Sequence, residues 1–310
     1  MFLSVTPNAV LDQVIFIDEF KSGSPIQARK VATGVGGKGL DASVALRHLG
    51  QSTSGLCCLA GEVGSQLLEQ LQRYGITPYP IWVAGETRTA LILAERSSGV
   101  HTHIFTGGLA LSLADREALL QAYERLLPQT RFVVTGGALP PGLADDFFAE
   151  LAGRARAAGV PLLVDTWGGP LLACLAVRPA VAKLNRAEFG LTFGQPEPGL
   201  PALSAAAIAV RVHYDLPALV VTCGAEGILA FTPAGAWKAT PPSQVVVNAA
   251  GAGDAASAAL AWRRAEGDDW PAALAWAAAV SAASVRTEAT SDLELAVAIE
   301  ILPQVEVSSF

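Results

Sequence analysis

The chain has 310 residues and a formal net charge of −7; 51% of its residues are hydrophobic and 16% are charged. This composition excludes an intrinsically disordered chain, and the length is sufficient for one large α/β domain with its own core. The negative charge argues against a general affinity for nucleic acid, so an anionic substrate would need a local cluster of basic groups.

The cysteines, the first residues and the longest apolar stretch predict a cytoplasmic protein without disulfides. The four cysteines form no CxxC pair, and Cys57 and Cys58 are adjacent in an apolar run, which favours buried, reduced thiols. Residues 1–7 lack the features of a signal peptide and predict a first strand. Residues 270–285 are fewer than the ~20 that a membrane helix needs and predict a buried helix.

Short β-branched runs alternate along the chain with longer segments rich in alanine and leucine. This alternation is typical of βαβ units around a mainly parallel sheet, a Rossmann-like α/β fold. The predicted core strands are 56–60, 132–135, 162–165, 180–184 and 219–222. The predicted helices are 40–49, 65–74, 112–127, 144–158, 204–213 and 254–265. Residues 194–199, which contain two prolines and two glycines, predict a surface loop.

Two regions interrupt this alternation with strands that have no helix between them. Runs 14–20 and 26–33 are separated by a Lys-Ser-Gly-Ser-Pro turn, and runs 89–94 and 100–105 flank an Arg-Ser-Ser-Gly turn. Four such strands predict a small inserted β-sheet, which would serve as a lid if it stood beside a cleft. We therefore expect a single domain over 1–310, with lid strands within about 13–33 and 86–106.

A glycine-rich loop at 248–254, with the sequence Asn-Ala-Ala-Gly-Ala-Gly-Asp, precedes a predicted helix. Glycines let backbone N–H groups surround an anion at the positive end of a helix, and such donors stabilise a phosphoryl group in transfer. Asp254 would lie in the first helical turn, where its carboxylate could accept a proton from a substrate hydroxyl. The alternative is that Asp254 only caps the helix.

A second glycine-rich segment, 33–39, contains a G-x-G-x-x-G pattern that could bind a dinucleotide, with Glu62 as the partner of the ribose. The segment follows the inserted strands and not the first core strand, which weakens this interpretation. Lys38 within it suits a phosphate or a hydroxyl-rich ligand better. The sequence contains no G-x-x-x-x-G-K-[ST] motif, which excludes a P-loop nucleoside triphosphatase.

Three further features fit binding of a nucleotide and a sugar, although each has a purely structural alternative. Asn185 and Glu188 follow a core strand, where they could organise Mg²⁺ through water or simply start a helix. Residues 222–227 form a strand and a glycine-bounded turn that could lie against a nucleotide or be an ordinary hairpin. Asp12 and Arg88 lie near the predicted hairpins, where they could bind sugar hydroxyls and a phosphate, respectively.

Seven segments, taken in order, resemble motifs of the ribokinase-like (PfkB) carbohydrate kinase family over nearly the whole chain. They are TPNAVLD at 6–12, GGKGL at 36–40, GETR at 85–88, TGGALPPG at 135–142, KLNRAE at 183–188, TCGAEG at 222–227 and NAAGAGD at 248–254. The branch they resemble contains 1-phosphofructokinase, tagatose-6-phosphate kinase and the minor 6-phosphofructokinase. The resemblance implies a β lid that often pairs between subunits, and hence a homodimer.

The resemblance also implies roles for single residues. Asp254 would be the catalytic base, and the backbone of Gly251, Ala252 and Gly253 would form the anion hole. The implied sugar-binding residues are Asp12, Gly36, Gly37, Lys38, Asp41, Arg88 and Gly137. The implied ATP-binding residues are Lys183, Asn185, Thr222, Gly224, Gly227 and Asn248. Glu188 would hold Mg²⁺ through water, and K⁺ is a candidate second cation.

Three positions depart from the family pattern. Asp41 stands where the family has Asn, and a carboxylate there would repel a phosphosugar unless it faced only hydroxyls. Gly137 stands where the branch usually has Ser, which removes a donor to the substrate. The strand near Pro25 lacks a phosphate-binding lysine of some members, although Arg29 and Lys30 lie close by.

We therefore expect a kinase that phosphorylates a ketohexose phosphate, namely fructose 1-phosphate, fructose 6-phosphate or tagatose 6-phosphate. An unphosphorylated sugar or a nucleoside is the alternative acceptor. A dinucleotide-dependent oxidoreductase and a non-catalytic binding protein are weaker alternatives, since a protein that only binds has no need of the base. The expected partners are small molecules and a second copy of the chain, with neither nucleic acid nor membrane.

Overall fold

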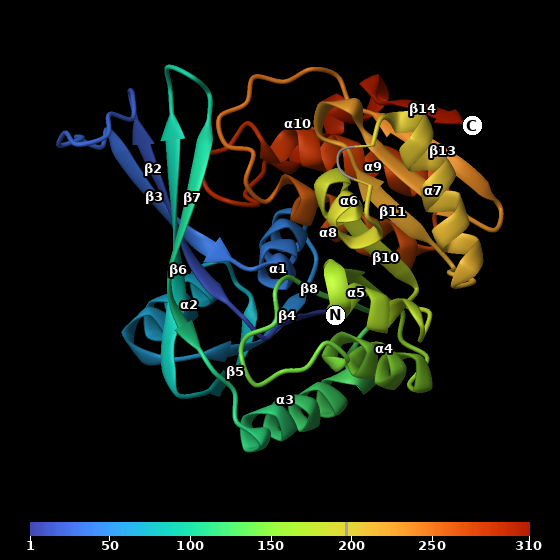
Figure 1. The fold of residues 1–310 in the computed structure, drawn as a ribbon, viewed down its shortest axis with the longest axis horizontal. Coiled ribbons are helices and arrows are strands. Elements are labelled where there is room, and N and C mark those ends of the chain that lie inside the picture. Colours follow the sequence, from blue (N-terminus) through green and yellow to red (C-terminus); the bar gives the residue numbers. More distant parts are fainter. Residues whose placement is uncertain (196–197) are drawn as a thin grey trace.

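The computed structural model describes residues 1–195 and 198–310, which form two β-sheets and ten α-helices (Figure 1). The larger sheet has ten strands in the order β14-β13-β12-β11-β10-β9-β8-β1-β4-β5. Its strands are β1 Phe2–Thr6, β4 Thr53–Leu59, β5 Thr77–Trp82, β8 Phe132–Gly136, β9 Leu162–Asp165, β10 Val181–Asn185, β11 Leu219–Thr222, β12 Ile228–Thr232, β13 Gly235–Thr240 and β14 Glu306–Ser309. The seven strands from β11 to β5 are parallel, and β12, β13 and β14 extend that sheet in antiparallel fashion.

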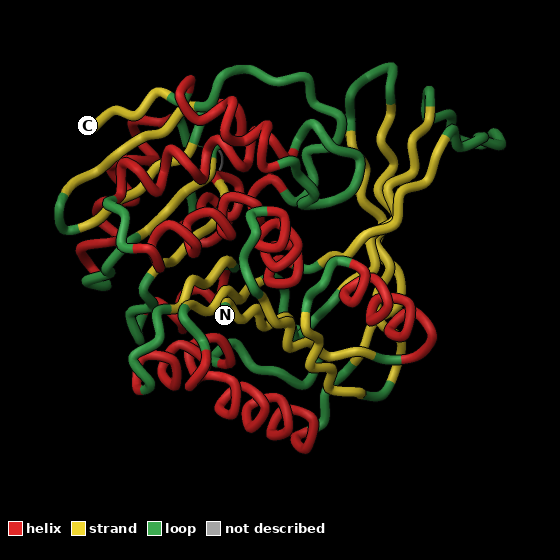
Figure 2. Tube along the Cα trace, turned by 180° about the vertical axis from the view of Figure 1, so that it is seen from behind, coloured by secondary structure: helices red, strands yellow, loops and turns green. Residues whose placement is uncertain are grey.

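Helices cover both faces of this sheet, as the view from behind also shows (Figure 2). They are α1 Lys38–His48, α2 Gly61–Arg73, α3 Leu113–Leu126, α4 Phe147–Ala157, α5 Gly168–Leu175, α6 Arg186–Phe193, α7 Leu200–His213, α8 Ala252–Glu266, α9 Trp270–Ser284 and α10 Leu295–Ile301. The predicted α/β fold is therefore confirmed, with the five predicted core strands and six predicted helices at nearly their expected positions.

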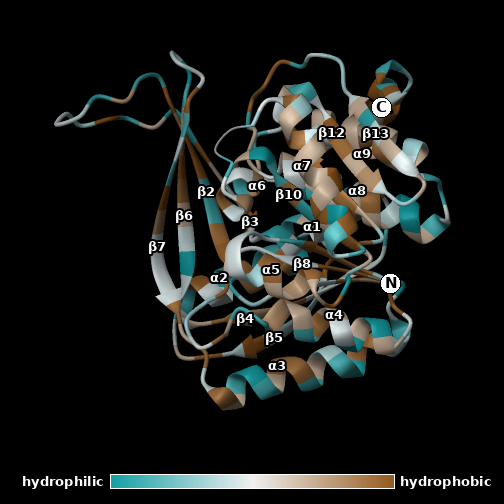
Figure 3. Ribbon diagram, turned by 45° about the vertical axis from the view of Figure 1, so that its right-hand side comes forward, coloured by the Kyte–Doolittle hydropathy of each residue, from teal (hydrophilic) through white to brown (hydrophobic). Residues whose placement is uncertain are grey.

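Alternating side chains of the strands pack into two separate apolar clusters, one on each face of the sheet. In β1, Leu3 and Val5 pack into the cluster beneath α3 and α4, whereas Phe2 packs into the cluster beneath α8 and α9. The inner surfaces of α8 and α9 are mostly alanine, which lets these two apolar helices lie close to the sheet (Figure 3). The four cysteines are buried and free, in line with the predicted reduced thiols.

Several elements were not expected from the sequence. Strand β5 contains Pro78 and Pro80, which are tolerated because it is the edge strand of the sheet. Helices α5 and α6 have eight residues each and are too short for a clear helical periodicity. The loop predicted at 194–199 includes residues 196 and 197, which lie outside the described residues.

The smaller sheet has four strands in the order β3-β2-β6-β7 and stands at one side of the α/β core (Figure 1). Its strands are β2 Val10–Ile17, β3 Lys30–Gly36, β6 Gly85–Glu95 and β7 His101–Leu109. The prediction placed β2 too late and β3 too early, because β2 begins four residues before its predicted run and β3 begins four residues after the start of its own. The connection between β2 and β3 is correspondingly longer than the predicted five-residue turn.

One face of this smaller sheet packs toward the core through Val10, Val14, Ala90 and Ile92, which meet Ala250 of the 248–254 loop. The sheet thus stands over the carboxyl ends of the core strands. Within the described residues, no helix combines the length and the apolar character needed to cross a membrane.

Candidate active site

The parallel strands bring the predicted site residues to one edge of the large sheet. Asp165 ends β9, and in the sheet register it lies opposite Gly136 of β8 and Lys183 of β10. Asn185 ends β10 and lies opposite Thr222 of β11. In open α/β sheets, ligands bind outside the carboxyl ends of such strands.

Asp165 is the centre of a buried ionic network. Its two carboxylate oxygens lie 2.6 Å from Nζ of Lys38 and 2.5 Å from Nζ of Lys183, and the Lys38 ammonium is also 2.7 Å from Glu188. Burial alone would raise the pKa of Asp165, but the two ammonium groups lower it to about 2. The network therefore brings the ammonium groups of Lys38 and Lys183 together on the ionised carboxylate of Asp165.

Lys38 reaches this network because it is the first residue of α1. Gly37, the N-cap of α1, has φ 102°, and a Cβ there would lie 2.8 Å from a methyl carbon of Thr6, so the turn requires glycine. The ammonium of Lys38 lies 5.0 Å from the ring centroid of Trp167, a cation–π contact. Burial opposes the charge on Lys38, but Asp165, Glu188 and Asp254 together raise its pKa, so the side chain is cationic.

Asp254 is the third residue of α8, next to the same two lysines. The N-cap of α8 is Gly251 with φ 79°, so the interpretation of Asp254 as the cap itself is wrong. Burial raises the pKa of Asp254 to about 7, and the charges of Asp165 and Glu188 add to this, whereas Lys183 and Lys38 oppose it. A carboxylate with a pKa near neutrality is suited to accept a proton from a hydroxyl.

Gly251, the N-cap of α8, is required by close contacts. A Cβ on Gly251 would lie 2.2 Å from Oγ of Ser291, and Asp254 N–H and Ala255 N–H both donate to the Gly251 carbonyl. A Cβ on Gly253 would point toward Nζ of Lys183 at 3.5 Å. The loop backbone and the lysine therefore border the same space at the positive end of α8.

Two further carboxylates lie on the side of the small sheet. Asp12 is on β2 and abuts Gly36, where a Cβ would be 2.2 Å from an Asp12 oxygen. Burial raises the pKa of Asp12 to about 7, although Thr290 and the charge of Arg88 oppose this shift. Asp41, in the first turn of α1, is almost completely buried, and its pKa is raised well above the usual value.

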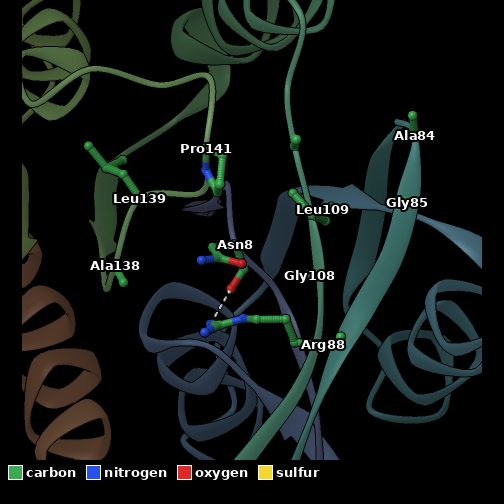
Figure 4. A pocket seen from close by; sticks show the side chains of 11 residues that line it. Asn8, Ala84, Gly85, Arg88, Gly108, Leu109, Ala138, Leu139 and Pro141 are labelled. Atoms are coloured by element: carbon green, nitrogen blue, oxygen red, sulfur yellow. Dashed lines mark hydrogen bonds between the residues drawn. The ribbon is translucent and has the colours of Figure 1, made fainter.

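Arg88 lies on β6 at the wall of a pocket of about 650 Å³ (Figure 4). It points from β6 toward the backbone of Asn8, whose carbonyl accepts a hydrogen bond of 3.3 Å from Nη2. The guanidinium also lies 5.5 Å from the ring centroid of Phe105, and within the described residues its Nε has no hydrogen-bond partner. A guanidinium with unmatched donors suits an anionic group of a ligand.

Ala138, Leu139 and Pro141 form the opposite wall of this pocket and also line a second pocket of about 440 Å³. The second pocket reaches Trp167 and Gly137. The Gly137 carbonyl accepts from the Thr166 hydroxyl at 2.9 Å, and its φ of 85° favours glycine. The two pockets thus extend from Arg88 to the residues around Lys38.

Two of the residues predicted to bind ATP form side-chain hydrogen bonds with backbone groups. Asn185 caps α6, where its side chain accepts from Glu188 N–H while the carboxylate of Glu188 accepts from Asn185 N–H, both at 2.8 Å. Asn248 is buried, donates to the carbonyl of Glu288 and accepts from Ala250 N–H. Both side chains therefore shape the loops that border the site.

Residues 222–227 form the hairpin between β11 and β12, as the structural alternative predicted. A Cβ on Gly227, which has φ 103°, would lie 2.2 Å from the carbonyl oxygen of Ala239. Gly224 begins the short 3₁₀ turn Gly224–Glu226 of this hairpin, and Glu226 pairs with Arg186 at 2.7 Å. This pair connects the hairpin to the start of α6.

The dinucleotide interpretation of residues 33–39 is not supported by the fold. Residues 33–36 belong to β3 of the small sheet, and α1 begins at Lys38, so no core strand precedes the helix as a dinucleotide site requires. Sequence reasoning also missed functional candidates. One sequence feature could have identified Asp165, namely a charged residue at the end of an apolar strand. No sequence feature pointed to Trp167 or Ser291.

Comparisons with known proteins agree with this geometry. Residues 5–296 match the model of the pfkB family carbohydrate kinases. The chain is 36% identical over 264 residues to the 1-phosphofructokinase of Xanthomonas campestris pv. campestris, covering 84% of this chain and 82% of that relative. It is 27% identical over 263 residues to the tagatose-6-phosphate kinase of Staphylococcus epidermidis, covering 84% of each.

Among solved structures, phosphofructokinase-2 of Escherichia coli in complex with potassium superposes with a TM-score of 0.87 at 21% identity, covering 98% of each chain. This likeness shows that the two chains share the ribokinase-like fold. Taken together with the family match over most of the sequence, it means that the chain belongs to the pfkB family of carbohydrate kinases and is a phosphotransferase that acts on an alcohol group.

Proposed function

We propose that this kinase transfers the γ-phosphate of ATP to a hydroxyl of a ketohexose phosphate: fructose 1-phosphate, fructose 6-phosphate or tagatose 6-phosphate. The observation that carries the proposal is the position of Arg88, a partly buried guanidinium with an unmatched donor on the wall of the pocket of about 650 Å³. The names of the two relatives support the same acceptor class.

In this proposal Asp254 takes the proton of the acceptor hydroxyl. The hydroxyl oxygen forms a bond to the γ-phosphorus while the bond from that phosphorus to the β–γ bridging oxygen breaks, and ADP leaves. The amides around Gly251–Gly253 and the ammonium groups of Lys38 and Lys183 stabilise the charge on the transferred group. The proton on Asp254 then passes to solvent.

The sugar would lie between these groups and the small sheet. Asp12 and Asp41 would bind its hydroxyls, and Arg88 would bind its phosphate. The backbone of Gly36, Gly37 and Gly137 would border the sugar. Close contacts at Gly36 and Gly37 leave no room for a larger residue at either position. We also propose that the small sheet is the lid of a single domain and that its closure excludes water during transfer.

The proposed nucleotide site would lie along the carboxyl ends of β10 and β11, away from the sugar site beside the small sheet. It comprises Thr222, Gly224 and Gly227 of the hairpin together with Asn185, Lys183 and Asn248. The short 3₁₀ turn and the two loops held by asparagine side chains would present backbone groups to the nucleotide.

Magnesium fits the donor set near Glu188. Carboxylate oxygens of Glu188 and Asp165 converge on one cationic group, the ammonium of Lys38, which marks this position as suited to positive charge. Glu188, with Asp165 beside it, would hold the ion through water, and bound Mg²⁺ supplies neutralisation of phosphate charge. Within the described residues no cluster of three or more His, Cys, Asp or Glu could hold a metal ion, so substrate phosphates would complete the coordination.

Pairing of two lids is the proposed route to a homodimer. The outward face of the small sheet carries Ile15, Leu91 and Leu93, with Val31 and Ile104 exposed on its outer strands. These five side chains share one face because they alternate with the inward-facing Val14 and Ile92. An exposed apolar sheet face of this kind favours burial against a second copy.

The proposal is tested by coupled ADP release with Mg-ATP on fructose 6-phosphate, fructose 1-phosphate, tagatose 6-phosphate, free fructose, ribose and several nucleosides. Turnover on a phosphosugar is the expected result. Turnover on uncharged acceptors alone would contradict the assignment of Arg88 while keeping the kinase. Repeating the assay with K⁺ in place of Na⁺ tests the candidate monovalent cation.

A further inference from the structure

Asp41 has an unusual environment for an ionisable side chain. Only 4% of the residue is exposed, and one carboxyl oxygen, Oδ1, is buried without a hydrogen-bond partner among the described residues. Asp41 faces two other carboxyl groups, Asp254 of α8 and Asp12 of β2. The Gly37 backbone and the Ser291 side chain are the neutral polar groups beside it.

The positive charges nearby act on the neighbours of Asp41. The charge of Arg88 lowers the pKa of Asp12, and the charges of Lys183 and Lys38 lower the pKa of Asp254. The charges of Asp292 and Asp41 also raise the pKa of Tyr74. Tyr74 contacts the ring of His48 at the end of α1, and His48 pairs with Asp292 at 2.7 Å. Among the described residues, the charged groups that shift the pKa of Asp41 are thus two carboxyls, with no ammonium or guanidinium group among them.

Ionisation of Asp41 is unfavourable for two physical reasons. Burial disfavours the charged form and raises the pKa of this carboxyl, and the negative charges of Asp254 and Asp12 raise it further. The Gly37 backbone and the Ser291 side chain oppose the shift without reversing it. An unpaired charge in this position would also leave Oδ1 buried without a donor, which is costly.

We propose that Asp41 is a neutral carboxylic acid that determines acceptor specificity, donating a hydrogen bond to one sugar hydroxyl and accepting another. This inference rests on the proposed function, because it takes the acceptor to lie beside Asp254. A protonated carboxyl offers one O–H donor and one carbonyl acceptor, which is the pair that an asparagine amide offers. A hydroxyl satisfies the buried oxygen of Asp41, whereas a phosphate would be repelled by the neighbouring carboxylates.

The expected repulsion between Asp41 and a phosphosugar therefore does not arise, since a neutral acid adds no negative charge. The phosphate of the acceptor goes to Arg88, whose positive charge acts on Asp12 and not on Asp41. A ketohexose phosphate has both groups, hydroxyls for Asp41 and a phosphate for Arg88. An acceptor that lacks the hydroxyl facing Asp41 would leave its polar atoms unpaired and would bind more weakly.

The protonation state is measured without any assay of activity. Infrared spectra of the wild type and of Asp41→Asn are recorded at neutral pH, with Asp146→Asn on the surface as the matched control. The expected result is loss of a protonated-carboxyl C=O band in Asp41→Asn and loss of only a carboxylate band in the control. Loss of a carboxylate band in Asp41→Asn would overturn the proposal.

Thermal unfolding gives a second readout. Because the pKa of Asp41 is raised on folding, the folded chain holds a proton that the unfolded chain releases, so this residue makes stability fall as pH rises above its ordinary pKa. The Tm of Asp41→Asn should exceed that of the wild type by a margin that grows with pH. An equal margin at every pH would contradict a raised pKa.

Kinetics then test the contact with the acceptor. KM for the phosphosugar should be roughly tenfold lower in Asp41→Asn than in Asp41→Ala, since one hydrogen bond is worth about a factor of ten. Wild-type KM should rise in alkaline solution as Asp41 ionises, and that rise should be absent in Asp41→Asn. Equal KM values in the two variants would exclude the hydrogen bond. If no acceptor in the panel is turned over, the proposed function fails, and the infrared and unfolding results still decide the protonation state.

Discussion

Asp165 and Lys183, adjacent in register on β9 and β10, form an ion pair of 2.5 Å in which both side chains are almost completely buried. The second oxygen of Asp165 reaches Lys38 on α1, so one carboxylate joins the sheet edge to the substrate loop. Ser257 of α8 also lies 3.3 Å from Asp165. Both lysines next to Asp254 are therefore held by this aspartate.

Replacing Lys183 tests that dependence. Lys183→Met should lower the free energy of unfolding by about 3 kcal/mol, because removing one partner leaves a buried carboxylate with less compensation. Denaturant unfolding measures this change. Lys21→Met is the control, because Lys21 belongs to an exposed ion pair with Glu19 and should change stability little. Equal effects of the two substitutions would show that burial does not govern the strength of the Asp165–Lys183 pair.

The base assignment predicts a selective loss of turnover. Asp254→Asn keeps the shape of the side chain and removes its ability to take a proton, so kcat should fall by ~10²-fold or more, as general-base catalysis is worth roughly 10²–10⁴-fold. Binding of Mg-ATP, measured by calorimetry, should change little. Near-normal turnover in this variant would rule out Asp254 as the base.

The pH dependence of turnover follows from the same residue. The pKa of Asp254 is raised to about 7, so the carboxyl is protonated and inactive below that pH and ionised and active above it. Since this pKa belongs to the free enzyme, we expect kcat/KM to rise about tenfold per pH unit below ~7 and to level off above it. A profile that is flat through this range would mean that another step limits turnover or that another group is the base.

Arg88 should discriminate between charged and uncharged acceptors. Because charge-assisted hydrogen bonds contribute about 1.5–3 kcal/mol, Arg88→Ala should raise KM for the phosphosugar by roughly 10- to 150-fold. KM for Mg-ATP should stay nearly constant. Arg96→Ala, in the exposed turn between β6 and β7, removes an arginine from the same sheet without touching the pocket. A similar KM change in both variants would point to the overall charge of the sheet and not to a phosphate site.

The lid dimer predicts an effect on oligomeric state. Ile104→Glu and Val31→Glu place charges on the exposed apolar face of the small sheet, where both residues are about half exposed in the single chain. If two lids pair, these variants should elute as monomers in size-exclusion chromatography with light scattering, whereas the wild type elutes as a dimer. A wild-type monomer would exclude the proposed interface.

The sequence by itself determined the α/β fold, the existence of four inserted strands and the residues of the two glycine-rich segments. These features are local, since hydrophobic periodicity, turn residues and short motifs are written in consecutive positions. The proline-containing edge strand β5 and the short helices α5 and α6 escaped this reasoning, because their local patterns are weak and the neighbouring sheet stabilises them.

Only the tertiary structure decided how the site is charged. It brought Lys38 to Asp165, 127 positions away, and it brought Asp41 close to Asp12 and Asp254, with no cation of the described residues among the groups that shift its pKa. A sequence names an aspartate at position 41, but the protonation of that aspartate depends on burial and on charges from other elements. Whether Asp41 repels a phosphosugar therefore depends on packing and electrostatics, which no local pattern contains.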